Sequence, residues 1–183
     1  MEEIVEQDGE VARLRNGDAR SWETLYRRVY PSMLAYAERR VSSKEEAQDA
    51  VSEALTRTVA GMDRFACSGA TPEAWLFGVL RHVVLDRQRG AYRRRDLPVR
   101  REVTTDDPAE LAEVGAEQVA VRNAFALLPD KDRDLLELRV VAGLSSEEVG
   151  SILDMRPGAV RTAQARALDR LRSILQRSEE VRA

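Results

Sequence analysis

Apolar residues recur at spacings of three and four along the first part of the chain, which is the pattern of amphipathic helices. One apolar stripe runs through residues 22–40 and predicts a helix. A second stripe, over residues 47–59, follows Ser43 and Glu46, whose spacing predicts a capping box at a helix start. Gly61 predicts the end of this second helix.

A third helix is predicted after a segment of turn composition, residues 65–71. Thr71 followed by Pro72 has the chemistry of a helix start, because threonine caps free N–H groups and proline suits the first helical position. Apolar positions from Trp75 to Val84 form the expected buried stripe of this helix.

The last third of the chain predicts four further helices. Two of them are residues 119–128, ended by Pro129, and residues 132–141, ended by Gly143. The next pair has a more specific pattern and is described separately below.

A short helix, a tight break and a long basic helix follow each other near the C-terminus. Ser145 and Glu148 predict a capping box for the short helix. Residues 154–157 interrupt the periodicity, and a longer helix is predicted from Gly158 through Gln176. This is the helix-turn-helix arrangement, in which the second helix enters the major groove of DNA.

Composition excludes several classes of protein. Aromatic residues make up only 5% of the chain, and alternating patterns are rare, which favours an all-α fold. The single cysteine, Cys67, excludes an intramolecular disulfide framework and fits a reducing compartment. No apolar run approaches the roughly 20 residues that cross a bilayer, and the N-terminus is acidic, so we expect a cytoplasmic protein.

The net charge of −3 conceals a segregation of charge along the chain. Residues 76–101 contain eight arginines and two acids, residues 102–118 six acids and no base, and residues 156–177 six arginines and one acid. The acidic stretch has little apolar periodicity at its start and predicts a flexible linker. The expected organisation is an N-terminal extension over 1–18, a first domain over 19–97, the linker over 98–118 and a second domain over 119–178.

The last predicted helix has one apolar side, formed by Val160, Ala167, Leu168, Leu171 and Leu175. Four residues near its start are then expected to point outward: Arg161, Thr162, Ala165 and Arg166. Arginine pairs with guanine edges or phosphate, and a helix N-terminus favours a phosphate anion. These residues therefore predict a DNA-reading face, although an amphipathic helix with a solvated basic face has the same pattern.

The third predicted helix ends in a group of arginines, at positions 87, 89, 93, 94 and 95. Such a cationic track gains from counterion release on nucleic acid, but a solvated charge run is an equal alternative. Trp75 and Phe77 could stack on unpaired bases, with Trp75 expected in the core and Phe77 left open. His82, the only histidine, has no metal-ligand spacing around it, and neither a metal, a cofactor nor catalytic residues are predicted.

Motifs in both halves carry a resemblance to one known family. In the first half the matching segments are residues 22–40, 46–55, 75–76 and 86–89; in the second they are residues 127–129, 143–145, 147–149, 157–162, 166–168 and 171–172. In this order, with an acidic segment between them, they resemble bacterial RNA polymerase sigma factors of the extracytoplasmic-function (ECF) class. Such proteins have a region-2 domain and a helix-turn-helix region-4 domain joined by a linker.

The resemblance implies a sigma factor that directs RNA polymerase to a set of promoters, under the control of an anti-sigma factor, without a small-molecule substrate or its own catalytic chemistry. It implies polymerase-binding residues Glu46, Asp49 and Glu53. It implies a loop over 65–70 and a following helix that capture melted minus-10 DNA through Cys67, Ser68, Trp75, Arg81, His82, Arg87 and Arg89. It also implies that the outward face, Arg161, Thr162, Ala165 and Arg166, meets the minus-35 duplex.

Two short segments depart from the usual family pattern. Arg81 is followed by His82, where the family usually has asparagine after a basic residue. Ala163 and Gln164 follow Thr162, where a basic and then an apolar residue are frequent, and Gln164 is expected to face the core. The promoter sequence therefore cannot be transferred from a relative.

Two other functions remain open from the sequence. One is a helix-turn-helix repressor or activator, which binds duplex DNA, usually as a dimer, without polymerase. The other is a helical interaction protein, such as an adaptor or anti-sigma partner, in which both basic helices are solvated faces. Only the sigma-factor interpretation accounts for the motifs of the first half.

Overall fold

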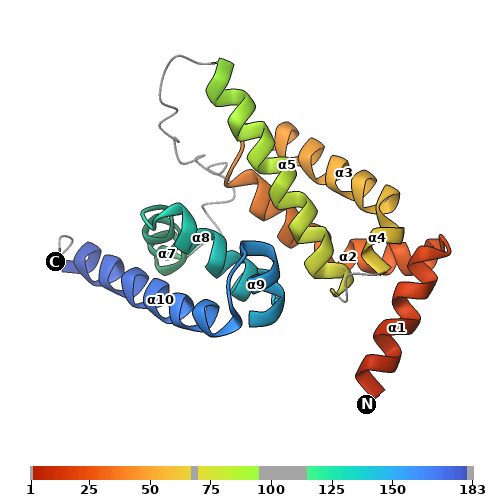
Figure 1. Cartoon of the computed structure of the whole chain (residues 1–183). Coiled ribbons are helices and arrows are strands. Elements are labelled where there is room, and N and C mark those ends of the chain that lie inside the picture. The colour runs from red at the N-terminus through yellow and green to blue at the C-terminus, as the bar shows by residue number, and fades with distance from the viewer. Residues whose placement is uncertain (1, 67–69, 95–114, 181–183) are drawn as a thin grey trace. The chain divides into compact units, whose positions relative to one another are not determined.

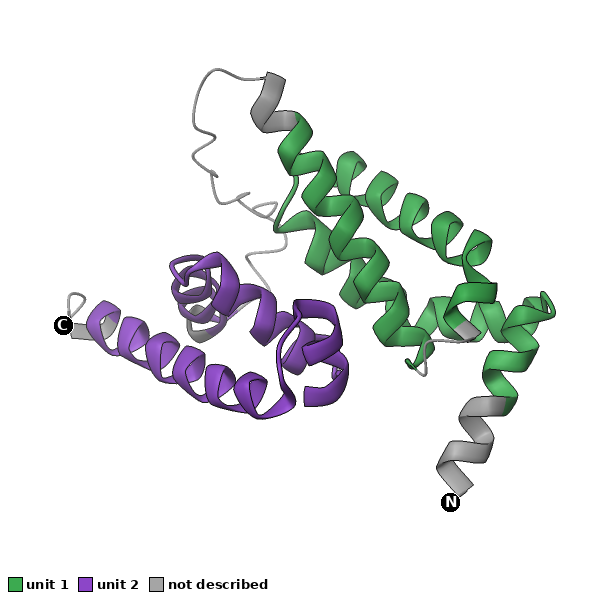
Figure 2. Ribbon diagram, viewed as in Figure 1, with its two compact units in different colours: residues 1–99 green, residues 100–183 purple. Residues whose placement is uncertain are grey.

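The computed structural model describes residues 2–66, 70–94 and 115–180, and every element in these ranges is a helix (Figure 1). The chain divides into two compact units, residues 1–99 and residues 100–183, which are considered separately (Figure 2). Over the described residues the expected all-α fold with two small helical domains is confirmed. Most of the predicted linker, and with it the arginine at position 95, lies outside these ranges.

Three long helices form the core of unit 1: α2 (Ala19–Glu38), α3 (Lys44–Ala60) and α5 (Pro72–Arg94). Helix α3 lies along α5 and also packs on α2. The inner face of α3 consists mainly of alanines, which lets the larger side chains of its neighbours approach closely. The fully buried side chains include Leu25, Val29 and Met33 of α2, Ala47, Ala50, Val51 and Ala54 of α3, and Leu76, Leu80, Val83 and Val84 of α5.

Caps define where two of these helices start. Asp18 precedes α2, and its carboxylate accepts the backbone N–H of Ser21 at 2.9 Å. Ser43 precedes α3 and accepts the N–H of Glu46 at 3.1 Å. The other half of the predicted capping box is wrong, because the carboxylate of Glu46 accepts the N–H and hydroxyl of Ser42 instead. The carboxylate still satisfies a free N–H beside the helix start.

The first part of the segment between α3 and α5 is helical. Gly61 ends α3 as predicted, and residues Met62–Ala66 form a short helix, α4, whose last two residues belong to the predicted turn segment 65–71. Phe65 explains this extension, because its ring is 2% exposed and packs 5.7 Å from the ring of Trp75. Cys67 and Ser68 lie outside the described residues.

The two aromatic residues at the start of α5 differ in burial, and the one expected in the core is the more exposed. Phe77, which the sequence left open, is 2% exposed and meets Tyr36 edge-to-face at 6.2 Å. Trp75, expected in the core, is only half-buried. A period of 3.6 residues places 77 with the fully buried Leu76, Leu80 and Val84, and 75 at the edge of this stripe.

The segment expected to be an N-terminal extension forms helix α1 (Glu2–Arg15) and packs on unit 1. Leu14 is 2% exposed, and the indole N–H of Trp22 donates to its carbonyl at 3.0 Å. The few apolar residues before Leu14 gave no strong periodicity, so the sequence pattern did not reveal this contact.

Unit 2 contains α7 (Ala116–Ala126), α8 (Asp130–Leu136), the π-helical turn η1 (Glu137–Val141), α9 (Ser146–Leu153) and α10 (Pro157–Glu180). The helix predicted over 132–141 is thus an α-helix that continues into a wider π-helical turn. The N–H of Ala142 donates to the carbonyl of Glu137 at 2.8 Å, and Gly143 then reverses the chain at φ +70°. The wider turn lets η1 bury Leu138 completely.

The predicted helix-turn-helix is formed by α9 and α10. Ser145 and Glu148 make the complete capping box at the start of α9. Asp154 ends α9 in the left-handed region, at φ 55°. The N–H of Met155 donates to the carbonyl of Gly150 at 2.8 Å, which closes the turn tightly against α9.

Candidate nucleic-acid interface

Helix α10 presents one side to the core of unit 2 and the other to solvent. Val160 and Ala167 are fully buried, and Ile174 is 9% exposed. Leu168 was expected on the inner side but is 38% exposed, whereas Ile174 was not assigned to it. The inner side therefore follows positions 160, 167, 171 and 174, and it is rotated slightly from the predicted stripe.

The outward face contains the four predicted residues, and all are exposed: Arg161, Thr162, Ala165 and Arg166. The hydroxyl of Thr162 donates to the carbonyl of Gly158 at 3.0 Å, which leaves its oxygen able to accept. Arg161 lies 3.6 Å from Glu147 of α9, a loose and exposed ion pair that a phosphate or a base can replace.

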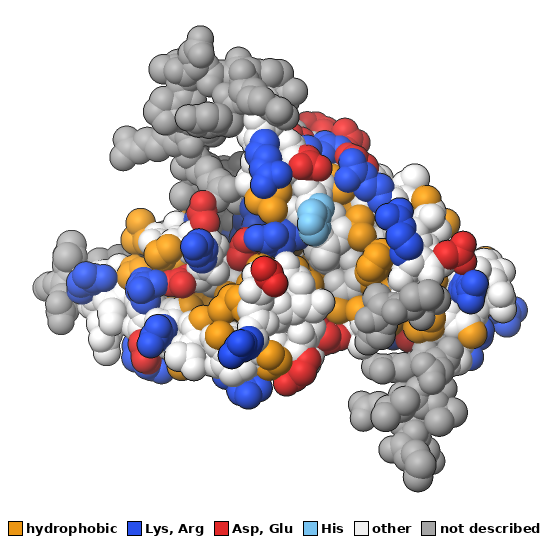
Figure 3. Space-filling model, in the orientation of Figure 1, with side chains coloured by type: hydrophobic (Ala, Val, Ile, Leu, Met, Phe, Trp, Pro, Cys, Tyr) orange, Lys and Arg blue, Asp and Glu red, His pale blue; other side chains and the backbone are white. Residues whose placement is uncertain are grey.

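Other arginines of α10 are occupied within unit 2. Arg170 pairs with Asp132 of α8, and Arg172 pairs with Asp169 at 2.7 Å. Blue side chains are spread along the surface that α10 forms in Figure 3, with acids among them. The cations available for base edges are therefore concentrated at the start of α10, at Arg161 and Arg166.

Gln164 connects α10 to the π-helical turn. The Nε of Arg139 donates to the Oε1 of Gln164 at 2.9 Å, and another nitrogen of Arg139 donates to the carbonyl of Leu144. Gln164 is half-buried, as expected for a residue on the core side. Because Arg139 also holds the residue before the capping box, it fixes both helices of the motif relative to η1.

The three predicted polymerase-binding residues of α3 comprise one open carboxylate and two occupied ones. Asp49 is exposed. Glu53 pairs with Arg57 at 2.6 Å and with Arg87 of α5 at 2.8 Å. Glu46 is held by Ser42, as described above, and its backbone carbonyl accepts from Arg87 at 3.4 Å. A basic partner would therefore meet Asp49 directly, and Glu53 only together with its two arginines.

The ion pair with Arg87 affects the titration of Glu53. The hydrogen bond from Arg87 holds the pKa of the Glu53 carboxyl below its ordinary value of 4.5, with a smaller contribution from Arg57. A carboxyl with a lowered folded-state pKa stabilises the fold above its unfolded pKa, and this contribution is lost as pH falls through the folded pKa. Glu53 therefore contributes to stability at neutral pH and loses this contribution in acid.

We expect Glu53→Gln to reduce the loss of stability on acidification. Urea unfolding followed by tryptophan fluorescence, at pH 7 and at about pH 4, should show a smaller change in the variant than in the wild type. Asp49→Asn removes an exposed acid one turn earlier in α3 and serves as the control. An unchanged pH dependence in Glu53→Gln contradicts a stabilising role for the pair.

The minus-10 candidates on α5 lie on different sides of the helix. Trp75, His82 and Arg89 are seven residues apart, so they share one side, and the last two are exposed. The ring Nδ1 of His82 lies 2.7 Å from the carbonyl of Gly78, and Arg89 lies 3.7 Å from Asp86. Arg81 is half-buried, and Arg87 faces α3 rather than solvent. Of the five candidates that the structure describes, Trp75, His82 and Arg89 thus share one side of α5.

Trp75 has one polar atom without a partner. Its Nε1 is buried and makes no hydrogen bond with the described residues. The ring lies at a tilt to Phe65, with centroids 5.7 Å apart, and one edge of it lies near Gly61, where a Cβ would be 3.7 Å away. These contacts fix the plane of the indole at the start of α5.

Two further observations limit the chemistry of the described residues. Residues 2–66, 70–94 and 115–180 contain no group of three or more His, Cys, Asp or Glu side chains that could hold a metal ion. None of the helices seen in these ranges has the length and apolarity required to cross a membrane.

Comparisons with known proteins agree with this architecture. Residues 25–94 match the family Sigma-70 region 2, and residues 118–171 match Sigma-70, region 4. The chain is 34% identical over 179 residues to the ECF RNA polymerase sigma factor ShbA of Streptomyces griseus, covering 90% of this chain and 92% of that protein. This chain is a member of the ECF RNA polymerase sigma factors. The expected family is therefore confirmed, and with it the function of directing RNA polymerase to promoters.

Other relatives of this ECF sigma factor extend the comparison. SigD of Mycobacterium tuberculosis is 33% identical over 177 residues, covering 90% of this chain and 82% of SigD. The solved structure of RpoE from Bartonella quintana, in complex with the anti-sigma factor NepR, is 24% identical. The structural match covers 86% of this chain and 98% of the RpoE chain, with a TM-score of 0.71, and it supports the fold. Sigma factors are initiation factors rather than enzymes in themselves.

Proposed function

We propose that this sigma factor divides promoter recognition between its two units, with region 2 over 19–97 and region 4 over 119–178. The exposed start of α10 is the observation that carries this proposal. It presents Arg161 and Arg166 on the second helix of a helix-turn-helix, in the position from which such helices read the major groove. Arg161, Thr162, Ala165 and Arg166 would then contact the minus-35 duplex.

In unit 1 we assign two surfaces. Asp49 binds core polymerase, and Glu53 and Glu46 support it on the same helix. The side of α5 with Trp75, His82 and Arg89 meets the minus-10 DNA, where the indole offers a stacking surface and Arg89 a cation for the backbone. Arg81, Arg87, Cys67 and Ser68 remain candidates for the same region. Arg87 would have to leave Glu53 to reach DNA.

Four finer assignments complete the proposal. The protein acts in the cytoplasm, has no catalysis of its own and needs no cofactor, because polymerase carries out nucleotide transfer. It is controlled by an anti-sigma factor, as the complex of the Bartonella quintana protein with NepR suggests.

Run-off transcription with purified core polymerase on genomic fragments tests the function. We expect transcription from a defined subset of fragments only when the protein is added. Binding to duplex DNA as a dimer, without any effect on polymerase, would instead identify a repressor or activator. Polymerase binding without promoter-dependent transcription would identify an interaction protein.

Asp49→Ala is expected to weaken binding to core polymerase by about three- to tenfold without loss of stability, because an exposed charge at an interface mainly affects association. Fluorescence anisotropy of the labelled protein with core polymerase, at low and moderate salt, measures the effect. Glu23→Ala removes an exposed acid of α2 that pairs with Arg27 at 2.7 Å, and should leave the affinity unchanged. Equal affinities for Asp49→Ala and wild type would refute the assignment.

A further inference from the structure

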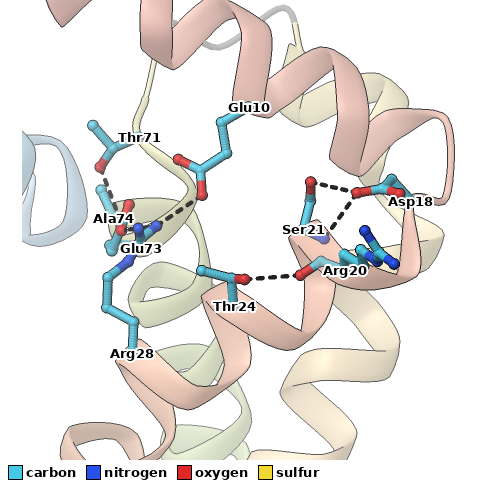
Figure 4. Close-up of polar contacts among 9 residues, drawn as sticks. All are labelled: Glu10, Asp18, Arg20, Ser21, Thr24, Arg28, Thr71, Glu73 and Ala74. Carbon is cyan, nitrogen blue, oxygen red and sulfur yellow. Dashed lines mark hydrogen bonds and ion pairs between the residues drawn. The ribbon is translucent and has the colours of Figure 1, made fainter.

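Arg28 of α2 joins two helices that are distant in the sequence. Its Nη2 lies 2.9 Å from a carboxylate oxygen of Glu10 in α1 and 2.5 Å from one of Glu73 in α5 (Figure 4). The side chains of Glu10 and Glu73 are 21% and 25% exposed, so both acids are partly withdrawn from water. Without the guanidinium between them, the two carboxylates would repel each other, and α1 would lose its charged contact with α5.

Helix α1 also contacts the helix that precedes α5. Arg15 near the end of α1 lies 3.3 Å from Asp63 of α4. The buried Leu14, with its hydrogen bond from Trp22, fixes α1 on α2 between these two contacts. Helix α1 is therefore held against α2, α4 and the first turn of α5 together.

The first turn of α5 is the part of unit 1 that α1 reaches through Arg28. Glu73 lies there beside Thr71, whose hydroxyl accepts the N–H of Ala74 at 3.3 Å (Figure 4). Trp75 follows two residues later and packs on Phe65 of α4. Any shift of α4 or of the start of α5 would thus move the indole that we assign to minus-10 DNA.

We propose that Arg28 is a positioning residue for minus-10 recognition, and that the N-terminal helix α1 acts through it as a brace for α4 and the start of α5. Arg28 itself does not touch DNA in this proposal. It neutralises Glu10 and Glu73, and so fixes the helix start that orients Trp75. This inference rests on the proposed function, because it takes region 2 to read the minus-10 element.

The neighbouring Arg27 offers a matched control. It is also an arginine of α2 with a carboxylate partner, but that partner is Glu23 on the same helix, and both side chains are mostly exposed. Removing Arg27 changes the charge of α2 by the same amount and breaks no contact between helices. Arg28→Lys keeps the charge and shortens the side chain, so this variant should retain part of the minus-10 discrimination that Arg28→Ala loses.

The experiment measures transcription by holoenzyme from three promoters: the preferred sequence, one substituted at minus 10 and one substituted at minus 35. For Arg28→Ala and Glu10→Gln we expect discrimination at minus 10 to fall by about threefold, which is the scale of a partly exposed ion pair. Discrimination at minus 35 should stay unchanged. The double variant should lose no more than Arg28→Ala alone, because both changes break one network.

Hydrogen exchange on the full free chain gives a second readout. Amides of α4 and of residues 71–75 should exchange about threefold faster in Arg28→Ala than in wild type, and Arg27→Ala should match wild type. If Arg28→Ala is too unstable to purify, Glu10→Gln and Arg28→Lys carry both measurements.

Separate outcomes overturn the two proposals. Wild-type minus-10 discrimination in Arg28→Ala, or equal losses at minus 10 and minus 35, overturns the brace while the sigma-factor function stands. A wild-type chain that supports no promoter-dependent transcription overturns the proposed function, and the positioning role falls with it. If Arg27→Ala loses as much minus-10 discrimination as Arg28→Ala, the effect comes from the net charge of α2 alone. This result also overturns the brace.

Discussion

Replacing Gly150 with alanine is expected to destabilise unit 2 by about 2 to 3 kcal/mol, the upper part of the range for inserting a carbon into a packed site. A Cβ at this position would lie 2.5 Å from the carbonyl oxygen of Met155, which belongs to the backbone of the tight turn. The turn cannot move aside without breaking the hydrogen bond from Met155 to Gly150. The variant should therefore open the helix-turn-helix.

Gly158→Ala is the matched control, because the nearest atom to its Cβ is the flexible end of Arg161 at 3.9 Å. This change should be neutral or stabilise α10 slightly. The two units can be followed separately, since every tryptophan and tyrosine lies in residues 1–99. Tryptophan fluorescence should show the same unfolding of unit 1 in all variants, while circular dichroism shows an earlier loss of helix only in Gly150→Ala. Coincident curves for both glycine variants would contradict the close approach.

Arg161→Ala and Arg166→Ala should each weaken binding to the preferred minus-35 sequence by about 1 to 3 kcal/mol and affect scrambled DNA much less. The reason is that arginine paired to base edges carries sequence information, whereas phosphate contacts do not. Both side chains are exposed at the start of α10, where a groove-reading helix presents its residues. Promoter binding by holoenzyme at fixed salt is the appropriate measurement.

Arg172→Ala provides the comparison on the same helix. Arg172 is exposed, but it lies three turns further along α10 and pairs with Asp169. Its removal should produce a small loss that is equal on both sequences. If Arg161→Ala and Arg166→Ala behave in the same way as Arg172→Ala, the start of α10 is only a generic cationic surface.

Much of the fold could be predicted because local chemistry at helix ends agrees with tertiary packing. Ser145 and Glu148 defined the start of α9, and Thr71 with Pro72 defined the start of α5. Such signals involve residues one to three positions apart, so they are visible in the sequence. They placed the helix-turn-helix and its outward face correctly.

Other features depend on contacts that no local pattern encodes. Helix α4 extends two residues into the segment of predicted turn composition, where Phe65 packs on Trp75. The ion pair of Glu53 with Arg87 joins residues 34 positions apart, and it takes up a carboxylate and an arginine that had been assigned to different partners. Spacing along one helix could show that Glu53 shares a face with Asp49, but not that α5 already supplies a cation there.

The buried side of α10 was also predicted only approximately. An ideal helical period did not reveal that Leu168 is exposed and Ile174 is buried. The packing of α10 on α7, α8 and α9 decides this, because contacts on several sides determine its rotation. The error did not affect the outward residues, since these lie near the middle of the exposed face.

The bond between Arg139 and Gln164 has a consequence for retargeting promoter specificity. The reading residues of α10 lie on one exposed face, which favours exchanging this helix for the recognition helix of another sigma factor. Gln164, however, accepts from Arg139 on the opposite side. If the grafted helix had an apolar residue at position 164, the half-buried guanidinium of Arg139 would lose the acceptor of its Nε. The transferable unit is therefore the recognition helix together with position 139, and chimaeras that graft α10 alone should inherit its specificity at a cost in stability.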